Sequence, residues 1–211
     1  MKQFNNISTI IFDLGGVLCD LDIDRCIMNF KQLGLENFEH YLNNFGQSGF
    51  FMQLEKGLIN DDEFRSEVRK LTSKSLTNEQ INDAWNSFLV GIPTEKLDII
   101  LELRKKFRII MLSNTNIIHF PNTVARFFNY NGKKLTDFFD KCYLSYEMKM
   151  AKPDAEIFLK LLEDEQVQAN QCLFLDDGLK NINQAQMLGL QTYLVVPNEN
   201  LSFLLNNETW Q

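Results

Sequence analysis

The 211-residue sequence lacks the residues from which zinc sites and disulfide frameworks are built. It contains two histidines and four cysteines, and none of the cysteines form a CxxC pair. Structural zinc sites need four such ligands at short, defined spacings, so we expect no zinc site. The absence of a disulfide framework fits a reducing compartment, and we expect a cytoplasmic protein.

The sequence also lacks long apolar runs and long basic runs. The first twelve residues carry one lysine and a short apolar stretch, too short and too polar for a signal peptide or a membrane span. The formal net charge is −7, and the longest basic run is Arg104-Lys105-Lys106. We therefore expect neither nucleic acid nor a membrane as a partner. The negative net charge does not exclude an anionic substrate, because a metal, a lysine and backbone N–H groups can bind phosphate inside an acidic protein.

The overall composition is that of a globular protein. Apolar residues make up 45% of the chain and charged residues 23%, and the length suffices for one domain with a modest insertion. Phenylalanine is abundant, with 18 copies, which indicates an aromatic-rich core.

Five short apolar runs without polar alternation are typical of buried parallel strands. They are Thr9–Phe12, Ile109–Leu112, Cys142–Leu144, Cys172–Leu175 and Thr192–Val196. Helical patterns at Leu97–Lys106, Ala155–Glu163 and Leu179–Leu188 precede the second, fourth and fifth runs. Strands that alternate with helices predict an α/β fold with a doubly wound, Rossmann-like parallel sheet.

The long gap between the first two runs contains no convincing strand but does contain helical patterns. They cover Asp61–Leu71 and Thr77–Val90, and in the second Thr77 and Gln80 have the spacing of a capping box. A helical insertion directly after the first strand predicts a lid over the end of that strand. We expect residues 1–19 and 93–211 to form the sheet domain and residues 20–92 to form a helical cap.

Polar residues follow four of the apolar runs, at the edge of the sheet where ligands bind in open α/β folds. They are Asp13 with Gly15 and Gly16, Ser113 with Asn114, Lys152, and Asp176 with Asp177. A carboxylate can attack phosphorus, Mg²⁺ prefers carboxylates and carbonyls, and a lysine with hydrogen-bond donors can hold phosphoryl oxygens. The set predicts phosphoryl transfer, although Asp13 or the acid pair taken alone could equally cap a helix or turn.

The chain resembles the haloacid dehalogenase superfamily of hydrolases. Four motifs match in order, namely IIFDLGGVL, MLSNTN, the lysine of AKPDAEIF, and LFLDD followed by NINQAQMLGL. The segment between the first two motifs resembles the helical cap of the subgroup whose cap is inserted after the first motif. FDLGGVLCDLD together with LSNTN looks most similar to phosphatases that act on sugar phosphates such as glucose 1-phosphate.

The resemblance implies a magnesium-dependent phosphatase that acts on small phosphate monoesters. Asp13 would be the nucleophile, and Lys152 would contact both Asp13 and the phosphoryl group. Ser113 and Asn114 would bind the phosphoryl group. Asp13, the carbonyl of Gly15, Asp176 and Asp177 would hold Mg²⁺. Asn181 and His119 are expected to be structural, and Phe50, Phe51 and Trp85 are expected to form the core of the cap.

Two positions depart from the pattern of the family. Most of its phosphatases carry a second aspartate two residues after the nucleophile, which serves as general acid and base, and here that position is Gly15. Loss of that group predicts slow turnover of alkyl phosphates, with the smallest penalty for good leaving groups. Asp20 or Asp22 could supply a substitute carboxylate through a folded-back loop. Lys149 stands where relatives often have glycine.

Two other functions stay open on the sequence alone. A 2-haloacid dehalogenase uses an equivalent aspartate on carbon without a metal and also lacks the second aspartate, but the pair Asp176-Asp177 weighs against it. A weakened member of the family that binds a ligand or partner without turnover is the other alternative. The oligomeric state is expected to be a monomer or a homodimer.

Overall fold

The computed structural model describes residues 3–36, 38–43, 46–47 and 49–210. At its centre is a five-stranded sheet with the order β7-β6-β1-β8-β9, in which all neighbouring strands are parallel. The strands are β1 (Thr9–Phe12), β6 (Arg108–Ser113), β7 (Lys141–Leu144), β8 (Cys172–Asp176) and β9 (Gln191–Leu194). The five strands predicted from apolar runs are confirmed, and so is the doubly wound α/β fold.

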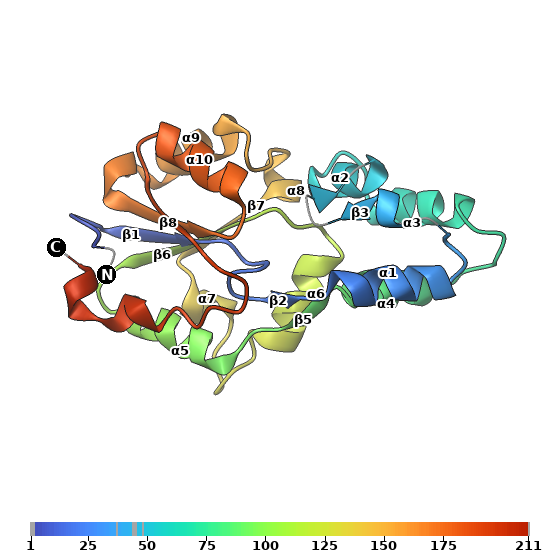
Figure 1. The fold of residues 1–211 in the computed structure, drawn as a ribbon, viewed down its shortest axis with the longest axis horizontal. Coiled ribbons are helices and arrows are strands. Elements are labelled where there is room, and N and C mark those ends of the chain that lie inside the picture. The colour runs from blue at the N-terminus through green and yellow to red at the C-terminus, as the bar shows by residue number, and fades with distance from the viewer. Residues whose placement is uncertain (1–2, 37, 44–45, 48, 211) are drawn as a thin grey trace.

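Helices cover both faces of this sheet (Figure 1). Alternate strand residues point to opposite faces, so Ile11 belongs to one apolar cluster while Ile10 and Phe12 belong to another. Helices α9 (Ala155–Glu165) and α10 (Leu179–Met187) pack on the first face, and α5 (Thr94–Leu103) and α7 (Leu135–Phe138) on the second. The sheet is thereby buried on both sides, as the unbroken apolar runs predict.

The segment between β1 and α5 forms a separate helical layer beyond one end of the sheet (Figure 1). It contains α1 (Ile23–Gln32), α2 (Gly49–Glu55), α3 (Asp61–Lys70) and α4 (Asn78–Asn86), with a short turn of helix at Phe38–His40. Capping boxes begin α3 at Asn60 and α4 at Thr77. The layer has its own buried cluster, which includes Phe51 and Trp85, as expected for a core rather than a ligand site.

Two expectations for this segment are wrong. The predicted helix Thr77–Val90 ends at Asn86, and Leu89–Gly91 instead forms strand β5, antiparallel to β2 (Asp20–Leu21). Apolar residues at 88–90 fit either period, and the partner that selects the strand lies far away in sequence. The second wrong expectation is that this segment contains no strand. Leu42–Asn43 and Gly46–Gln47 also pair, as β3 and β4.

The β2–β5 pair is the stem through which the chain leaves the sheet domain and returns to it. Arg25 closes it by donating hydrogen bonds to the carbonyls of Ser87 (2.6 Å) and Leu89 (3.2 Å). The stem lies where the sequence places the boundaries of a cap at residues 20–92. The division into two domains stays a prediction, and the two separate apolar clusters support it.

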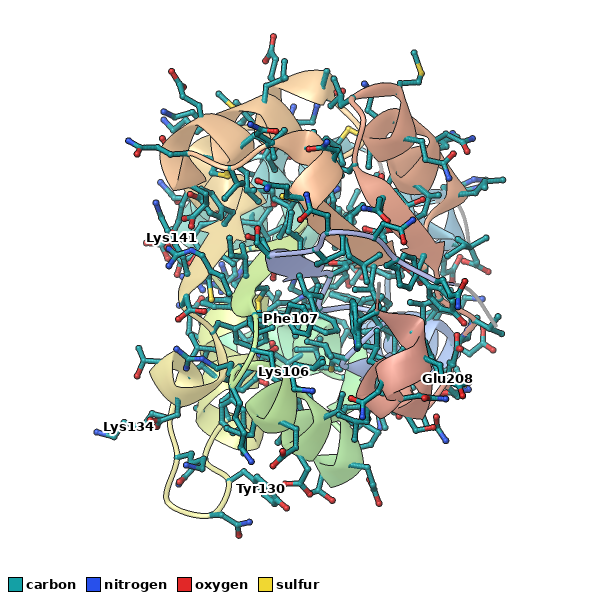
Figure 2. All side chains as sticks on the ribbon, turned by 90° about the vertical axis from the view of Figure 1, so that its left-hand side faces the viewer. Lys106, Phe107, Tyr130, Lys134, Lys141 and Glu208 are labelled. Carbon is teal, nitrogen blue, oxygen red and sulfur yellow. The ribbon has the colours of Figure 1, made fainter. Side chains whose placement is uncertain are left out.

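The first and last described parts of the chain meet at the end of the molecule that is opposite to the helical layer, where Phe4 pairs with Trp210 (Figure 1). Figure 2 looks onto that end, where Lys106, Phe107 and Glu208 lie to one side of the strands and Lys134 points away from the sheet. The functional residues predicted from sequence follow the other, carboxyl ends of the strands. Within the described part of the chain, no helix has the length and apolar character that a membrane crossing needs.

Helix α2 contacts the sheet domain through its last residue and the two that follow. The carbonyl of Glu55 accepts a hydrogen bond from Ser145 Oγ (2.7 Å), and Lys56 pairs with Asp154 (3.2 Å). Gly57 has a φ of +60°, and a Cβ atom there would lie 2.0 Å from the carbonyl oxygen of Tyr146. Glu55 and Gly57 thus fix the end of α2 against α8 (Ser145–Met148), and Lys56 ties it to the start of α9.

We expect Gly57→Ala to lower the free energy of unfolding by more than the cost of placing an alanine in a left-handed conformation. The left-handed conformation alone costs an alanine about 1–2 kcal/mol, and the contact with Tyr146 requires the backbone to move as well. Gly132→Ala is the matched control, because Gly132 has a similar φ of +72° but no atom within 4 Å of the added Cβ. Urea unfolding of both variants measures the difference. Equal losses would show that α2 is not tightly packed on α8.

Candidate active site

Asp13 lies at the carboxyl end of the central strand and begins a tight loop. Its backbone N–H donates to the carbonyl of Leu175 (2.9 Å), which continues the pairing of β1 with β8. Its Oδ1 accepts a hydrogen bond from the N–H of Leu14 (2.7 Å). The loop folds back on Leu14, whose carbonyl accepts from the N–H groups of Leu18 and Cys19. Lys96 stabilises this loop by donating a hydrogen bond from its Nζ to the carbonyl of Val17 (2.7 Å). The Asp13 side chain is thereby fixed before any ligand binds.

Lys152 joins this aspartate to the neighbouring strand. Its Nζ lies 2.9 Å from Asp13 Oδ1 and 2.7 Å from Asp176 Oδ2, and its side chain is 1% exposed. Burial opposes the charge of the ammonium, but the two acids outweigh that effect and hold the pKa of Lys152 above its ordinary value. The lysine is therefore a fixed positive charge between two carboxylates.

Asn114 positions the backbone of Lys152. Its Oδ1 accepts from the N–H of Lys152 and its Nδ2 donates to the carbonyl of the same residue, both at 2.9 Å. Sequence reasoning places Asn114 on the phosphoryl group, and the second hydrogen of Nδ2 is still available for that contact. Ser113 is buried at the end of β6, with its hydroxyl 3.5 Å from the carbonyl of Asn114. At that distance the bond is weak, which leaves the hydroxyl able to donate to a ligand.

Asp176 and Asp177 complete an acidic cluster with Asp13. Each of the three offers one carboxylate oxygen, and these oxygens lie within 4.8 Å of one another. Asp176 is fully buried, and its Oδ1 accepts from the N–H of Gly178 (2.7 Å) and from Nδ2 of Asn181 (2.9 Å). Asn181 thus positions an acid, as expected for a structural residue. Asp177 is exposed and faces the cluster from the rim.

The charges in this cluster do not balance. The pKa of Asp13 is raised to about 8, because burial and the charges of Asp176 and Asp177 outweigh the opposing charge of Lys152. Burial and Asp176 likewise raise the pKa of Asp177. Three carboxylates beside one ammonium leave an excess of negative charge, which a divalent cation with oxygen ligands would neutralise. The donor set therefore fits Mg²⁺.

Of the two glycines that follow Asp13, Gly16 leaves the space that the carboxylate of Asp177 occupies. Gly16 has a φ of +73°, and a Cβ atom there would lie 2.0 Å from Asp177 Oδ2. At Gly15 an added Cβ would meet the side chain of Leu21 at 3.2 Å. Lys149, where relatives often have glycine, has a φ of +56° at the end of α8, which is the conformation that glycine favours.

The candidate substitutes for the missing aspartate are engaged elsewhere. Asp20 lies 3.5 Å from Lys96 Nζ, and the Asp22 side chain caps α1 by accepting from the N–H of Arg25 (2.9 Å). His119 is also structural, as expected. It is buried beside the rings of Trp85 and Phe88, and burial lowers the pKa of the imidazole to about 4.

Sequence reasoning misses one acid at this site, Glu55, the last residue of α2. Burial raises the pKa of its carboxyl to about 7, and the charge of Lys152 opposes that rise. The carbonyl of Glu55 accepts a hydrogen bond from Ser145 Oγ, which itself accepts from the N–H of Thr115, so the end of α2 lies at this edge of the sheet. The segment LEKGL shows only that a helix ends before a glycine, because the approach of α2 to Lys152 is set by tertiary packing.

Comparison with known protein families identifies the same superfamily that the four sequence motifs resemble. A model of the haloacid dehalogenase-like hydrolases matches residues 7–189. The chain belongs to this family. The four motifs that resemble this family contain the residues that meet at the ends of β1, β6 and β8 and in the loop of Lys152.

Individual relatives cover nearly the whole chain. A D-ribitol-5-phosphate phosphatase from Bacteroides thetaiotaomicron is 39% identical over 187 residues, which are 89% of this chain and 91% of that protein. A crystal structure of a family enzyme from the same organism, a variant complexed with magnesium and inorganic phosphate, superposes with a TM-score of 0.93 at 45% identity. That comparison covers 95% of this chain and all of the other. A predicted hydrolase of the family from Porphyromonas gingivalis superposes with a TM-score of 0.87 at 37% identity, covering 96% and 99% of the two chains.

Proposed function

We propose that this protein is a magnesium-dependent phosphatase that hydrolyses small phosphate monoesters through an aspartyl-phosphate intermediate on Asp13. The observation that carries the proposal is the arrangement of Lys152 between Asp13 and Asp176 inside a cluster of three acids. A relative that is complexed with magnesium and inorganic phosphate supports the same assignment.

Each residue of the cluster has a part in this reaction. The described contacts of the Asp13 side chain go to Oδ1, so Oδ2 is the oxygen that attacks phosphorus. Lys152, Ser113 and Asn114 hold the phosphoryl oxygens. Asp13, Asp176, Asp177 and the carbonyl of Gly15 would hold Mg²⁺. The ion, when bound, neutralises the acids and the charge that develops on the phosphoryl group.

The substrate is a phosphorylated sugar or polyol. The motifs resemble phosphatases of sugar phosphates such as glucose 1-phosphate, and a relative at 39% identity is a D-ribitol-5-phosphate phosphatase. Both compounds are small, hydroxyl-rich phosphate monoesters, of which the first is an anomeric and the second an alkyl ester. The 39% identity to the ribitol-phosphate enzyme favours an open-chain polyol phosphate as substrate. We infer that the protein is cytoplasmic and acts as a monomer or a homodimer.

The acidic cluster favours a phosphatase over a 2-haloacid dehalogenase. A dehalogenase binds an anionic carboxylate and needs no metal, so a second and third acid beside the nucleophile would repel its substrate. Three carboxylate oxygens within 4.8 Å of one another instead favour a bound divalent cation.

A panel of phosphate esters, assayed for phosphate release with Mg²⁺ and with EDTA, tests the proposal. We expect hydrolysis of p-nitrophenyl phosphate, ribitol 5-phosphate and glucose 1-phosphate with Mg²⁺, and a loss on the order of 10²-fold or more with EDTA, as for removal of a major electrostatic contact. A chloride assay on 2-chloropropionate with EDTA is run beside it. Halide release without phosphate release would overturn the proposal.

A further inference from the structure

The proposed reaction needs a proton donor that the loop of the nucleophile does not supply. An alkyl alcohol is a poor leaving group unless its oxygen is protonated as the bond to phosphorus breaks. Gly15 has no side chain for this purpose, Asp20 is paired with Lys96, and Asp22 caps α1. If this chain hydrolyses polyol phosphates, the proton comes from another element.

The direction of attack indicates where that element lies. In an in-line displacement the leaving oxygen is on the far side of phosphorus from the attacking oxygen. Asp13 attacks from the end of β1, so the leaving oxygen faces away from the sheet, toward the helical layer beyond the strand ends (Figure 1). Because Gly15 offers no acid from the loop of the sheet domain, the proton donor is expected on the cap.

Glu55 is an acid of the cap whose backbone lies at this edge of the sheet. The charge of Lys152, the lysine that contacts Asp13, acts on the pKa of the Glu55 carboxyl. Its backbone is fixed to the loop that holds the phosphate, because Ser145 Oγ donates to Glu55 O (2.7 Å) and accepts from the N–H of Thr115 (2.9 Å). The residue after it is tied to the sheet domain by the Lys56–Asp154 ion pair.

We propose that Glu55 is the general acid and base of the reaction, taking the place of the aspartate that the sequence lacks at Gly15. This assignment rests on the proposed phosphatase function. It places the proton donor on the cap and the nucleophile on the sheet, so the complete site forms only where α2 packs on α8.

The two steps balance in protons. In the first, Asp13 Oδ2 bonds to phosphorus, the bond from phosphorus to the ester oxygen breaks, and protonated Glu55 gives its proton to the leaving alkoxide. In the second, ionised Glu55 takes a proton from water as the hydroxide oxygen bonds to phosphorus. The bond from phosphorus to Asp13 then breaks, which restores the free carboxylate, protonated Glu55 and inorganic phosphate.

The local environment suits both steps. Burial favours the protonated carboxyl and Lys152 favours the ionised one, so the pKa of Glu55 is raised only to about 7. A group whose pKa is close to the working pH is present in both forms and can serve as acid and as base.

Glu55→Gln tests the assignment, because it keeps the shape of the side chain and removes the proton. We expect kcat for ribitol 5-phosphate to fall by about 10²–10⁴-fold, the usual contribution of a general acid or base. With p-nitrophenyl phosphate the leaving phenolate needs no proton, so the variant still releases one equivalent of phenolate in a rapid burst. Its steady-state rate then falls, because water is no longer deprotonated.

Two further variants separate chemistry from structure. Glu79→Gln removes the same charge from an exposed position on α4 and should leave both substrates and the burst unchanged. Glu55→Asp keeps the proton on a shorter side chain and should recover part of the lost alkyl-phosphate turnover. A residue that only supported the fold would slow the burst and the steady state together.

The outcomes distinguish this assignment from the function on which it rests. Alkyl-phosphate turnover by Glu55→Gln within about threefold of the wild type would overturn the assignment and leave the phosphatase intact. Loss of the p-nitrophenyl burst in a folded Glu55→Gln protein would also overturn it. A wild-type protein that hydrolyses no ester would overturn the phosphatase function, and the assignment with it.

Discussion

Asp13→Asn is expected to abolish phosphate release while leaving the protein folded. An amide oxygen does not form the acyl phosphate, and loss of a covalent nucleophile costs on the order of 10⁴-fold or more in turnover. The fold should not suffer, because burial and two neighbouring acids raise the pKa of Asp13 and make its charge costly. We therefore expect the melting temperature of the metal-free variant to equal or exceed that of the wild type.

Phosphate release and thermal unfolding, measured on the same preparation, check this result. The exposed Asp98 supplies the control, since Asp98→Asn makes the same change away from the acidic cluster and should retain activity. Acid-quenched wild-type protein should also carry the mass of one phosphoryl group, which Asp13→Asn should lack. Full activity in Asp13→Asn would remove the aspartate from the chemistry altogether.

Lys152→Met should damage both activity and stability. Methionine fills the space of the lysine stem but leaves Asp13 and Asp176 facing each other without a cation. Breaking a buried ion pair by removing one partner costs about 3–5 kcal/mol, and losing one electrostatic contact to the transition state costs about 10²–10³-fold in kcat. Mg²⁺ should restore part of the stability, because it supplies positive charge to the same acids, but little of the activity.

Urea unfolding with and without Mg²⁺ measures the first effect, and phosphate release measures the second. Lys160→Met is the matched control, since Lys160 pairs with Asp164 on the surface of α9 with its side chain 45% exposed. Exposed pairs contribute about 0–1 kcal/mol, so the control should be nearly neutral in both assays. Similar losses in the two variants would show that Lys152 has no special place between the acids.

The sheet could be predicted because its signals are local. Each strand is a short apolar run, and the helix that follows β8 is marked by Gly189 after its last turn, while α4 is marked by the Thr77–Gln80 capping box. The order of these elements along the chain implies the parallel topology, and the polar residue after each strand then falls at one edge of the sheet. Nearly all of the acidic cluster and its lysine follow from that reasoning.

The stem and Glu55 could not be predicted because their signals are not local. Strand β5 has three residues, and only its pairing with Asp20–Leu21 distinguishes it from the end of a helix. Glu55 ends a helix whose sequence fits any amphipathic segment, and its raised pKa results from burial that only the tertiary packing of α2 creates. Asn114 could be placed at the site from the sequence, but its role there could not. The sequence does not reveal that its side-chain amide hydrogen-bonds the backbone of Lys152.

The central position of β1 has a consequence for how the chain is made. Thr9 pairs with Arg108 on one side and with Cys172 on the other, so the strand that emerges first from the ribosome waits longest for its neighbours. Such long-range parallel pairing is slow and leaves apolar strands open to aggregation in the meantime. The residues of α1–α4 emerge during that wait and pack mainly on one another, so the cap can condense before the sheet that it covers exists.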